Sequence, residues 1–528
     1  MSLDPYAKCP CGSGKKLKFC CSDIADEMDK VHRMIEGDQH AAALSYVTNL
    51  LAKHPARPPL LDTRITLEME FDKLDEAGAT IAHFLKVHPN DLIAHAQKAI
   101  YLSHRGEVPA AVDSLQNAME ALVENAIPMR VYDAFGAVAA ALLSAGDIFA
   151  AQGHLMFQIR LLGNDDTEAV ELMTALFRET TIPLVLRDEP SLAWPPEDTP
   201  WRAKAEEALH ALVNGRWRKA ERQLEALIEP SGGDACVWWN LAIARGWQAK
   251  KEPMLAALRY YMTKDVSVDE ASLAAALWIA LEPATQKRVR LLQRTFEVSE
   301  IEELERRLAE NRRIYRMNAP MKGSPDAPPP RAVYLLLDRD MPSSAMGLSL
   351  DQVPNTINSA SLFGRETDRP ARLELIGREG RPMDRSTELL LSAAPDSFGP
   401  SSDAAIDEVR DRSEALGWAL VFPSETPIES RKQLSIEKAR RQLFVEWPDA
   451  PSPEIDGKTP REMASLPEGR SVVLGMILLL ETNYEAEWGL DFNALRREVG
   501  LPEAGPLEPN AFGKRNIPLV MLHRIAPE

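Results

Sequence analysis

Two stretches of similar pattern decide the fold: GDQHAAALSYVTNLLAKHP, which spans residues 37–55, and FDKLDEAGATIAHFLKVHP, which spans residues 71–89. Both end in a His-Pro pair, and the two pairs lie 34 residues apart. Further copies of the pattern begin at Gly106, Gly146, Gly215 and Lys250. A segment rich in Ala and Leu that repeats at a fixed period predicts a row of stacked helical units.

Each copy carries a small residue and, four positions later, a larger one that we expect to fill the gap between two helices. The small residues are Ala42, Ala77, Ala111, Ala151, Ala220 and Ala256. The larger residues are Tyr46, Ile81, Leu115, Leu155, Leu224 and Tyr260. A 34-residue helix–turn–helix unit resembles the tetratricopeptide (TPR) repeat. The resemblance covers about half of the chain and implies an α-solenoid whose concave groove binds proteins.

The repeats are predicted over residues 23–179 and 202–317, with a connector at 180–201 between them. The connector contains five prolines, which forbid a continuous helix. It is therefore either an ordered or a swinging link between two sub-arrays. We expect a capping helix at the end of the second sub-array, begun by a capping box of Ser299 and Glu302. Pairs of Glu302 with Arg306 and Glu303 with Arg307 are expected on its exposed face.

The pattern changes after a Pro-rich linker at 318–330. Short strands separated by polar loops are expected to begin near Arg331, Ala371, Trp418 and Arg441. Thr459 and Glu462 then form a capping box for a short helix, and a second helix follows Pro467. Residues 331–528 are therefore predicted to form a small α+β domain, and the whole chain is predicted to be mainly α.

Four of the five cysteines lie within CPCGSGKKLKFCC, residues 9–21. The chain shows no signal peptide and no apolar stretch of about 20 residues, which predicts a reducing cytoplasm where disulfides are rare. A Walker A phosphate loop requires four residues between its glycines, whereas one residue separates Gly12 from Gly14. Four thiolates at this spacing suit a tetrahedral Zn²⁺ site instead. The predicted ligands are Cys9, Cys11, Cys20 and Cys21.

This stretch resembles the SEC-C motif, found at the C-terminus of the SecA translocation ATPase and in many other bacterial proteins. Its pattern is C-x-C-x8-C followed by His or Cys, with a lysine-rich middle. The four cysteines match the ligand positions, and Lys15, Lys16 and Lys18 match the basic middle. The resemblance covers residues 1–22 only. It implies a zinc knuckle that docks on a partner such as a SecB-like chaperone or the ribosome; a knuckle with a purely structural role is the alternative.

Length and charge narrow the class of partner. A chain of 528 residues is long enough for two or three domains, and its net charge of −18 argues against general nucleic-acid binding. Residues 1–22 differ, because Lys8, Lys15, Lys16 and Lys18 outweigh Asp4. We therefore expect a small cationic tip on an acidic body, which favours protein or ribosome partners over DNA.

The sequence offers weak support for catalysis. Only His523 lies beyond His210 among the histidines, so the C-terminal region lacks a Cys–His pair. Asp338 and Asp340 follow an apolar strand and form the candidate metal site of an alternative, metal-dependent enzyme. Pro342 stands where haloacid-dehalogenase-type enzymes need Thr or Val, which favours a solvated turn. A third hypothesis is an antitoxin-like binding module, because the segment from Trp447 faintly resembles the toxin-binding domain of Xre-type antitoxins. We expect a non-enzymatic adaptor protein.

Overall fold

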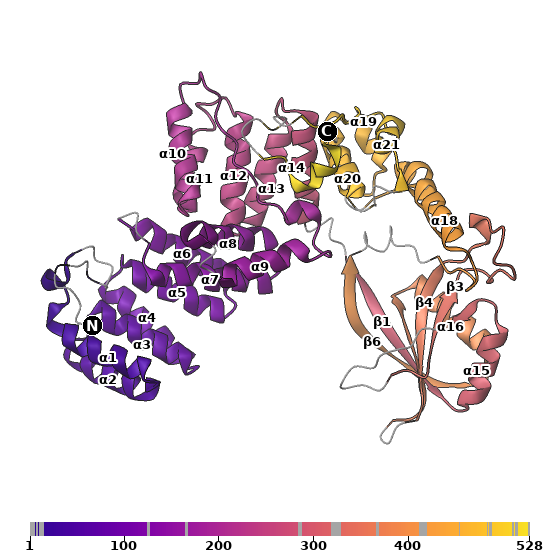
Figure 1. Cartoon of the computed structure of the whole chain (residues 1–528), viewed down its shortest axis with the longest axis horizontal. Coiled ribbons are helices and arrows are strands. Elements are labelled where there is room, and N and C mark those ends of the chain that lie inside the picture. Colours follow the sequence, from indigo (N-terminus) through magenta and orange to yellow (C-terminus); the bar gives the residue numbers. More distant parts are fainter. Residues whose placement is uncertain are drawn as a thin grey trace. The chain divides into compact units, whose positions relative to one another are not determined.

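The chain is described by a computed structural model over residues 6, 9, 15–123, 127–163, 167–282, 288–317, 329–365, 369–410, 420–452, 455–482, 484, 488–508, 512 and 516–525. It divides into two compact units. The first, the helical unit, comprises Met1–Ala280, Leu474–Asn483 and Ala504–Glu528. The second, the sheet unit, comprises Leu281–Val473 and Tyr484–Glu503. Both are drawn in Figure 1.

Helices arranged in consecutive pairs make up most of the helical unit (Figure 1). The described residues contain six pairs joined by short turns: α1 (Ala25–Glu36) with α2 (His40–Lys53), α3 (Pro58–Glu70) with α4 (Leu74–Val87), α5 (Leu92–His104) with α6 (Val108–Ala121), α7 (Met129–Ser144) with α8 (Ile148–Leu162), α10 (Arg202–Val213) with α11 (Trp217–Glu225), and α12 (Ala235–Trp247) with α13 (Lys251–Met262). Two further helices are α9 (Thr167–Arg178) and α14 (Val268–Leu281). The predicted row of helical repeats is confirmed.

The same turn joins the two helices of all six described pairs. Its central residue has positive φ, and these residues are Asp38, Asp72, Gly106, Gly146, Gly215 and Ala249. The next N–H donates to a carbonyl five residues earlier, as in Glu107 to Leu102 at 2.9 Å and Lys250 to Arg245 at 3.0 Å. This is a Schellman C-cap, which satisfies carbonyls that the ending helix leaves without partners. The turn thus sets the register of every repeat.

Ala249 is the turn residue least suited to its conformation, because its Cβ is strained at φ 56°. We expect Ala249→Gly to stabilise the helical unit by about 0.5–1 kcal/mol, since glycine adopts positive φ without that strain. The reverse change at an equivalent turn, Gly106→Ala, should destabilise the unit by about 1 kcal/mol. Urea unfolding of the full chain measures both changes. Shifts of the same sign would contradict this explanation.

The buried positions of the second helices follow the turn and correct part of the predicted register. Five residues after each turn residue lie Ala43, Ala77, Ala111, Ala151, Ala220 and Met254, all buried. Nine residues after it lie Val47, Ile81, Leu115, Leu155, Leu224 and Leu258, also buried. The prediction was therefore wrong for the first and last copies, where Ala42 and Ala256 are exposed. In the first copy, three adjacent alanines, Ala41–Ala43, hid the buried position, and in the last copy that position holds Met254 instead of a small residue.

The Pro-rich connector is ordered where it crosses α12. Trp239 Nε1 donates to the carbonyl of Ser191 at 2.9 Å. The side-chain amide of Asn240 pairs with both the N–H and the carbonyl of Ala193, at 2.9 and 2.7 Å. The two sub-arrays also contact directly, because Gln116 of α6 donates to the Gly215 carbonyl at 3.2 Å. Of the two alternatives for this connector, the structure therefore shows the ordered one.

A cluster of aromatic side chains packs at the junction between the two sub-arrays. Trp217 of α11 packs against Phe135, His154 and Phe157 of the first sub-array and against Trp247 of α12. A Cβ atom added at Gly153 would lie only 2.2 Å from Trp247 Cδ1, so this glycine lets α8 approach α12 closely. The junction is therefore part of a continuous core.

The sheet unit contains a six-stranded antiparallel sheet in the order β2-β3-β4-β5-β1-β6. Its strands are β1 (Arg288–Val298), β2 (Ile314–Arg316), β3 (Ala332–Leu337), β4 (Thr356–Phe363), β5 (Arg372–Arg378) and β6 (Phe398–Arg410). Helices α15 (Ile301–Glu310) and α16 (Arg381–Ala393) share a hydrophobic core with the strands. The predicted small domain with a sheet is confirmed in these coarse terms.

The prediction that helical repeats continue to residue 317 is wrong. Strand β1 begins at Arg288, where RVRLLQRTFEV partly alternates polar and apolar residues as a strand does. The expected capping helix forms as α15, but it buries Leu304 and Leu308 in the core of the sheet unit. It starts after Glu300 without a side-chain cap, so the expected capping box is absent. Arg307 pairs with Glu303 as expected, whereas Arg306 pairs with Glu303 and Glu310 instead of Glu302.

Two of the four strands predicted farther along the chain are confirmed, as β3 and β5. The strand predicted at Arg441 is wrong, because α18 (Ile428–Arg441) continues there into a π-helix at Gln442–Glu446. Trp418 and Ala419 of the strand predicted at Trp418 lie outside the described residues, as do residues 318–328 of the linker. The remaining residues, 420–423, form no strand, and Leu420 makes only an isolated β-bridge with Asn355.

The helices predicted after Thr459 form as expected. The capping box of Thr459 and Glu462 starts α19 (Pro460–Ser465). Helix α20 (Arg470–Glu481) follows the turn that begins at Pro467, and α21 (Phe492–Glu498) comes after it. Among the described helices, none has both the length and the apolar character needed to cross a bilayer.

Candidate metal centre at the N-terminus

Three of the four predicted zinc ligands come together. The Sγ atoms of Cys9, Cys20 and Cys21 all lie within 4.8 Å of one another, and those of Cys20 and Cys21 are 3.7 Å apart. Ligand atoms of a tetrahedral zinc site with bonds of about 2.3 Å lie roughly 3.8 Å apart. The 3.7 Å between the Cys20 and Cys21 sulfurs far exceeds the length of a disulfide bond. The cluster can therefore hold a metal ion.

Short local hydrogen bonds bring these cysteines together. The N–H of Cys9 donates to the Lys15 carbonyl at 2.7 Å, which closes the loop between the first and second halves of the motif. A 3-10 turn at Leu17–Phe19 then ends with the Cys20 N–H donating to the Leu17 carbonyl at 3.0 Å. Cys11 lies outside the described residues, so the structure places three of the four predicted ligands.

The cysteine cluster lies against the first two helix pairs. Arg57, just before α3, forms an ion pair with Asp23 and donates to the Cys20 carbonyl at 3.5 Å. Leu17 and Ile24 are buried, and Cys9 and Cys21 are each only 4% exposed. A cavity of about 100 Å³ beside the cluster is lined by Cys9, Leu17, Cys21, Ala25, Met28, His32, Pro58, Pro59, Asp62, Thr63 and Ile93. The cluster is thus anchored on the repeats.

The three predicted partner-binding lysines lie on the outer side of the motif, where Lys15 and Lys16 are exposed and Lys18 is half-buried. Lys18 Nζ lies 3.9 Å from the ring centroid of Tyr6 and 4.6 Å from that of Phe19. Both rings are well exposed, at 62% and 70%. We call Tyr6, Lys15, Lys16, Lys18 and Phe19 the knuckle tip. Tyr6 and Phe19 were not among the predicted partner-binding residues, although aromatic residues beside lysines in so short a motif are a usable signal.

The two aspartates of the alternative enzyme hypothesis lie in a turn after β3. Asp338 accepts hydrogen bonds from Asn355 N at 2.8 Å and Asn355 Nδ2 at 3.1 Å, and it pairs with Arg339 at 3.0 Å. Burial acts to raise the pKa of Asp338, but these hydrogen bonds and the guanidinium charge lower it below its usual value. The side chain thus fastens the turn. Within the described residues, no third ligating group joins Asp338 and Asp340 in a metal-sized cluster.

Comparison with known proteins identifies no family. No family model matches the chain, and no curated protein matches it. Among solved structures, the chain is similar to the crystal structure of the P58(IPK) TPR domain, with 14% sequence identity. The match covers 55% of this chain and 70% of that one, at a TM-score of 0.20. So low a TM-score carries no argument, and the helical-repeat fold rests on the helix pairs and turns described above.

Proposed function

We propose that this chain is a zinc-binding adaptor protein of the cytoplasm that acts by docking protein partners. The cysteine cluster carries the proposal, because three thiols meet at distances that suit one tetrahedral ion. Cys9, Cys11, Cys20 and Cys21 would hold Zn²⁺. Metal binding would supply the folding free energy of a motif too short to build a core of its own. The proposal assigns no catalytic step.

The TPR-like repeats would supply the main surface for protein partners, and the knuckle tip would supply a second one. The knuckle tip joins ammonium groups to exposed aromatic rings, which suits a partner surface that is acidic and partly apolar. By the SEC-C resemblance, a SecB-like chaperone or the ribosome is the proposed partner. Two weak sites on one chain bind together far more tightly than either alone.

Charge reversal at the knuckle tip tests the docking role. The triple variant Lys15→Glu, Lys16→Glu, Lys18→Glu should keep its zinc, because the lysines are not ligands. It should lose those partners that depend on the tip, with recovery falling about tenfold or more. Native co-purification from cells that make each variant at equal levels, followed by quantitative mass spectrometry, measures this loss.

A matched control separates the tip from the overall charge. Lys432, Lys438 and Lys458 lie in the sheet unit, outside the repeats, and are exposed or half-buried as the lysines of the tip are. Changing all three to Glu alters the net charge equally. The control variant should retain the partners. If both variants recover the same partners as the unchanged chain, the docking role of the knuckle tip is wrong, whether or not zinc is bound.

A further inference from the structure

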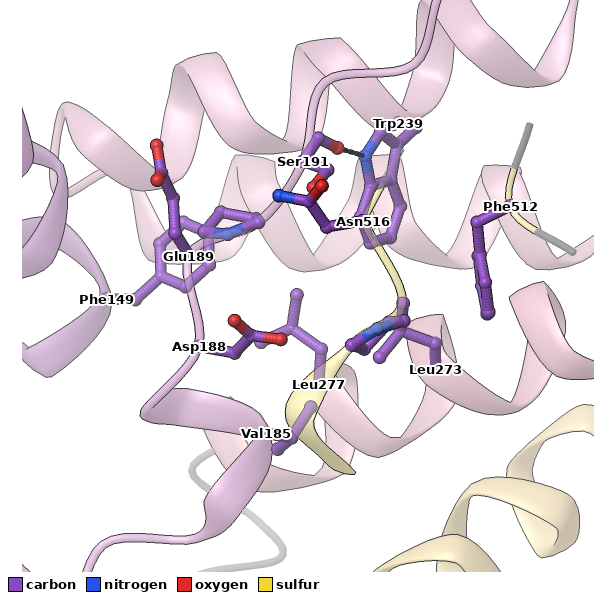
Figure 2. Close-up of a pocket in the computed structure, with 12 residues that line it drawn as sticks. Phe149, Val185, Asp188, Glu189, Ser191, Trp239, Leu273, Leu277, Phe512 and Asn516 are labelled. Atoms are coloured by element: carbon purple, nitrogen blue, oxygen red, sulfur yellow. Dashed lines mark hydrogen bonds between the residues drawn. The ribbon is translucent and has the colours of Figure 1, made fainter. Parts of the chain in front are cut away.

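A second cavity lies within the helical unit, among α8, α12, α14, the Pro-rich connector and the C-terminal segment (Figure 2). Its apolar walls are Phe149, Val185, Trp239, Leu273, Leu277 and Phe512, with Pro190 and Pro518 beside them. Its polar lining is Asp188, Glu189, Ser191 and Asn516. The volume is about 40 Å³, enough for roughly three water molecules or a small ligand group of similar size.

Hydrogen bonds hold the connector and the C-terminal segment, which form two walls of the cavity, in place. The connector is bound to α12 through the Trp239–Ser191 bond drawn in Figure 2 and through Asn240. The C-terminal segment is fixed at Leu519, whose N–H donates to Asp188 Oδ2 at 2.7 Å. Arg524 then pairs with Asp269 at the start of α14, at 2.6 Å. Both the connector wall and the C-terminal wall of the cavity are therefore held by hydrogen bonds or ion pairs to the helices or to each other.

Asp188 is the unusual group in this lining. Burial raises the pKa of its carboxyl, and the backbone N–H groups of Leu519 and Glu189 lower it in part. Within the described part of the chain it forms no ion pair, whereas the neighbouring Glu189 pairs with Arg160. Figure 2 shows the Asp188 carboxylate in the midst of the lining side chains. A partly buried carboxylate is stabilised by a cation bound beside it, because the two charges neutralise each other where water is scarce.

We propose that this cavity binds a guanidinium or alkylammonium group, with Asp188 as its counter-ion and Phe149, Trp239 and Phe512 as aromatic walls. Aromatic faces attract cations, and the attraction grows where water is excluded. The small volume admits the end of a side chain or a small amine and excludes a larger ligand. The group comes either from an Arg or Lys side chain of a protein partner or from a free small amine. The site is independent of the zinc knuckle.

Isothermal titration calorimetry on the full chain tests the proposal with three probes. Agmatine represents a free guanidinium compound, n-butylamine a free ammonium compound, and a blocked Gly-Gly-Arg-Gly-Gly peptide a protein side chain. At least one probe should bind saturably to one site. Asp188→Asn should weaken its binding about tenfold or more, since asparagine still accepts from Leu519 but carries no charge. Binding of the peptide alone identifies a protein partner, and binding of the free amines alone identifies a small ligand.

Two further variants make the outcome decisive. Asp198→Asn removes an exposed carboxylate from the same connector and should leave binding unchanged. Leu273→Phe fills the cavity without removing a hydrogen bond and should block binding, even if Asp188→Asn unfolds. The proposal is overturned if no probe binds the unchanged chain, or if Leu273→Phe binds as the unchanged chain does.

Discussion

Replacing Cys9 and Cys11 with serine should abolish zinc binding, from about one ion per chain to none. A serine hydroxyl is a poor ligand for Zn²⁺, and two remaining thiolates cannot complete a tetrahedral site. Structural zinc supplies about 10–16 kcal/mol in small zinc modules, so the motif should unfold when the metal is lost. The helix pairs should stay folded, because residues such as Val31, Leu60 and Ile65 form a core without the cysteines. Elemental analysis of the purified chain measures the zinc.

Cys236 provides a matched control for this result. Its side chain is buried at the start of α12, far along the sequence from the cysteine cluster. Cys236→Ala should therefore retain one zinc ion per chain. The zinc assignment fails if the double serine variant keeps its metal, or if the unchanged chain purified without chelators contains none.

Acidification should weaken the helical unit through His154. This imidazole is fully buried, and its Nδ1 lies 2.9 Å from the Ala150 carbonyl. Among the described residues, none forms a hydrogen bond with its Nε2. Burial lowers the pKa of His154 to about 4, because the aromatic surroundings cannot solvate the imidazolium, and the Ala150 carbonyl opposes this shift only in part. The unfolded chain therefore binds a proton at higher pH than the folded chain does. The free energy of unfolding should fall by roughly 3 kcal/mol between pH 6.5 and pH 4.

The contribution of His154 is isolated by comparing variants across that pH window. His154→Phe removes the titrating group and keeps a ring among Phe135, Phe157 and Trp217, so this share of the pH dependence should vanish. His104→Gln changes an exposed histidine and should leave this pH dependence of the free energy of unfolding unchanged. Urea unfolding at intervals from pH 4 to pH 7 gives the difference curve. Parallel curves for the unchanged chain and His154→Phe would contradict the role of His154.

The repeats were predictable because their local signals are strong. Gly106, Gly146 and Gly215 stand at turns that need positive φ, and each precedes an amphipathic helix. At Asp38 and Ala249 the same turn is made by residues other than glycine. The predicted register was wrong in these two copies because the first has a run of alanines and the last has Met254 where a small residue was expected. The cysteine cluster was predictable for a similar reason, since its ligands are close in the sequence.

For other elements, the local sequence pattern was not enough to predict the structure. The apolar run QLFVE suits either a strand or a helix, and it is helical because α18 continues into it without a break. Strand β1 was hidden because its ladder partners, β5 and β6, lie far along the chain. The cavity beside Asp188 is lined by residues more than 300 positions apart. A local sequence pattern cannot predict that such distant residues meet.

The contact between α20 and α14 in the helical unit can form only late in the synthesis of the chain. Gly475 of α20 covers α14 so closely that an added Cβ atom would lie 2.6 Å from the Cβ of Ala275. These two residues lie 200 positions apart in the sequence, so the ribosome needs roughly 10–40 s to go from one to the other at about 5–20 residues per second. Throughout that interval, the face of α14 that later packs against Gly475 is not yet covered by α20. The nascent chain therefore exposes this apolar face of α14 until residues 281–475, which include the whole six-stranded sheet, have been translated.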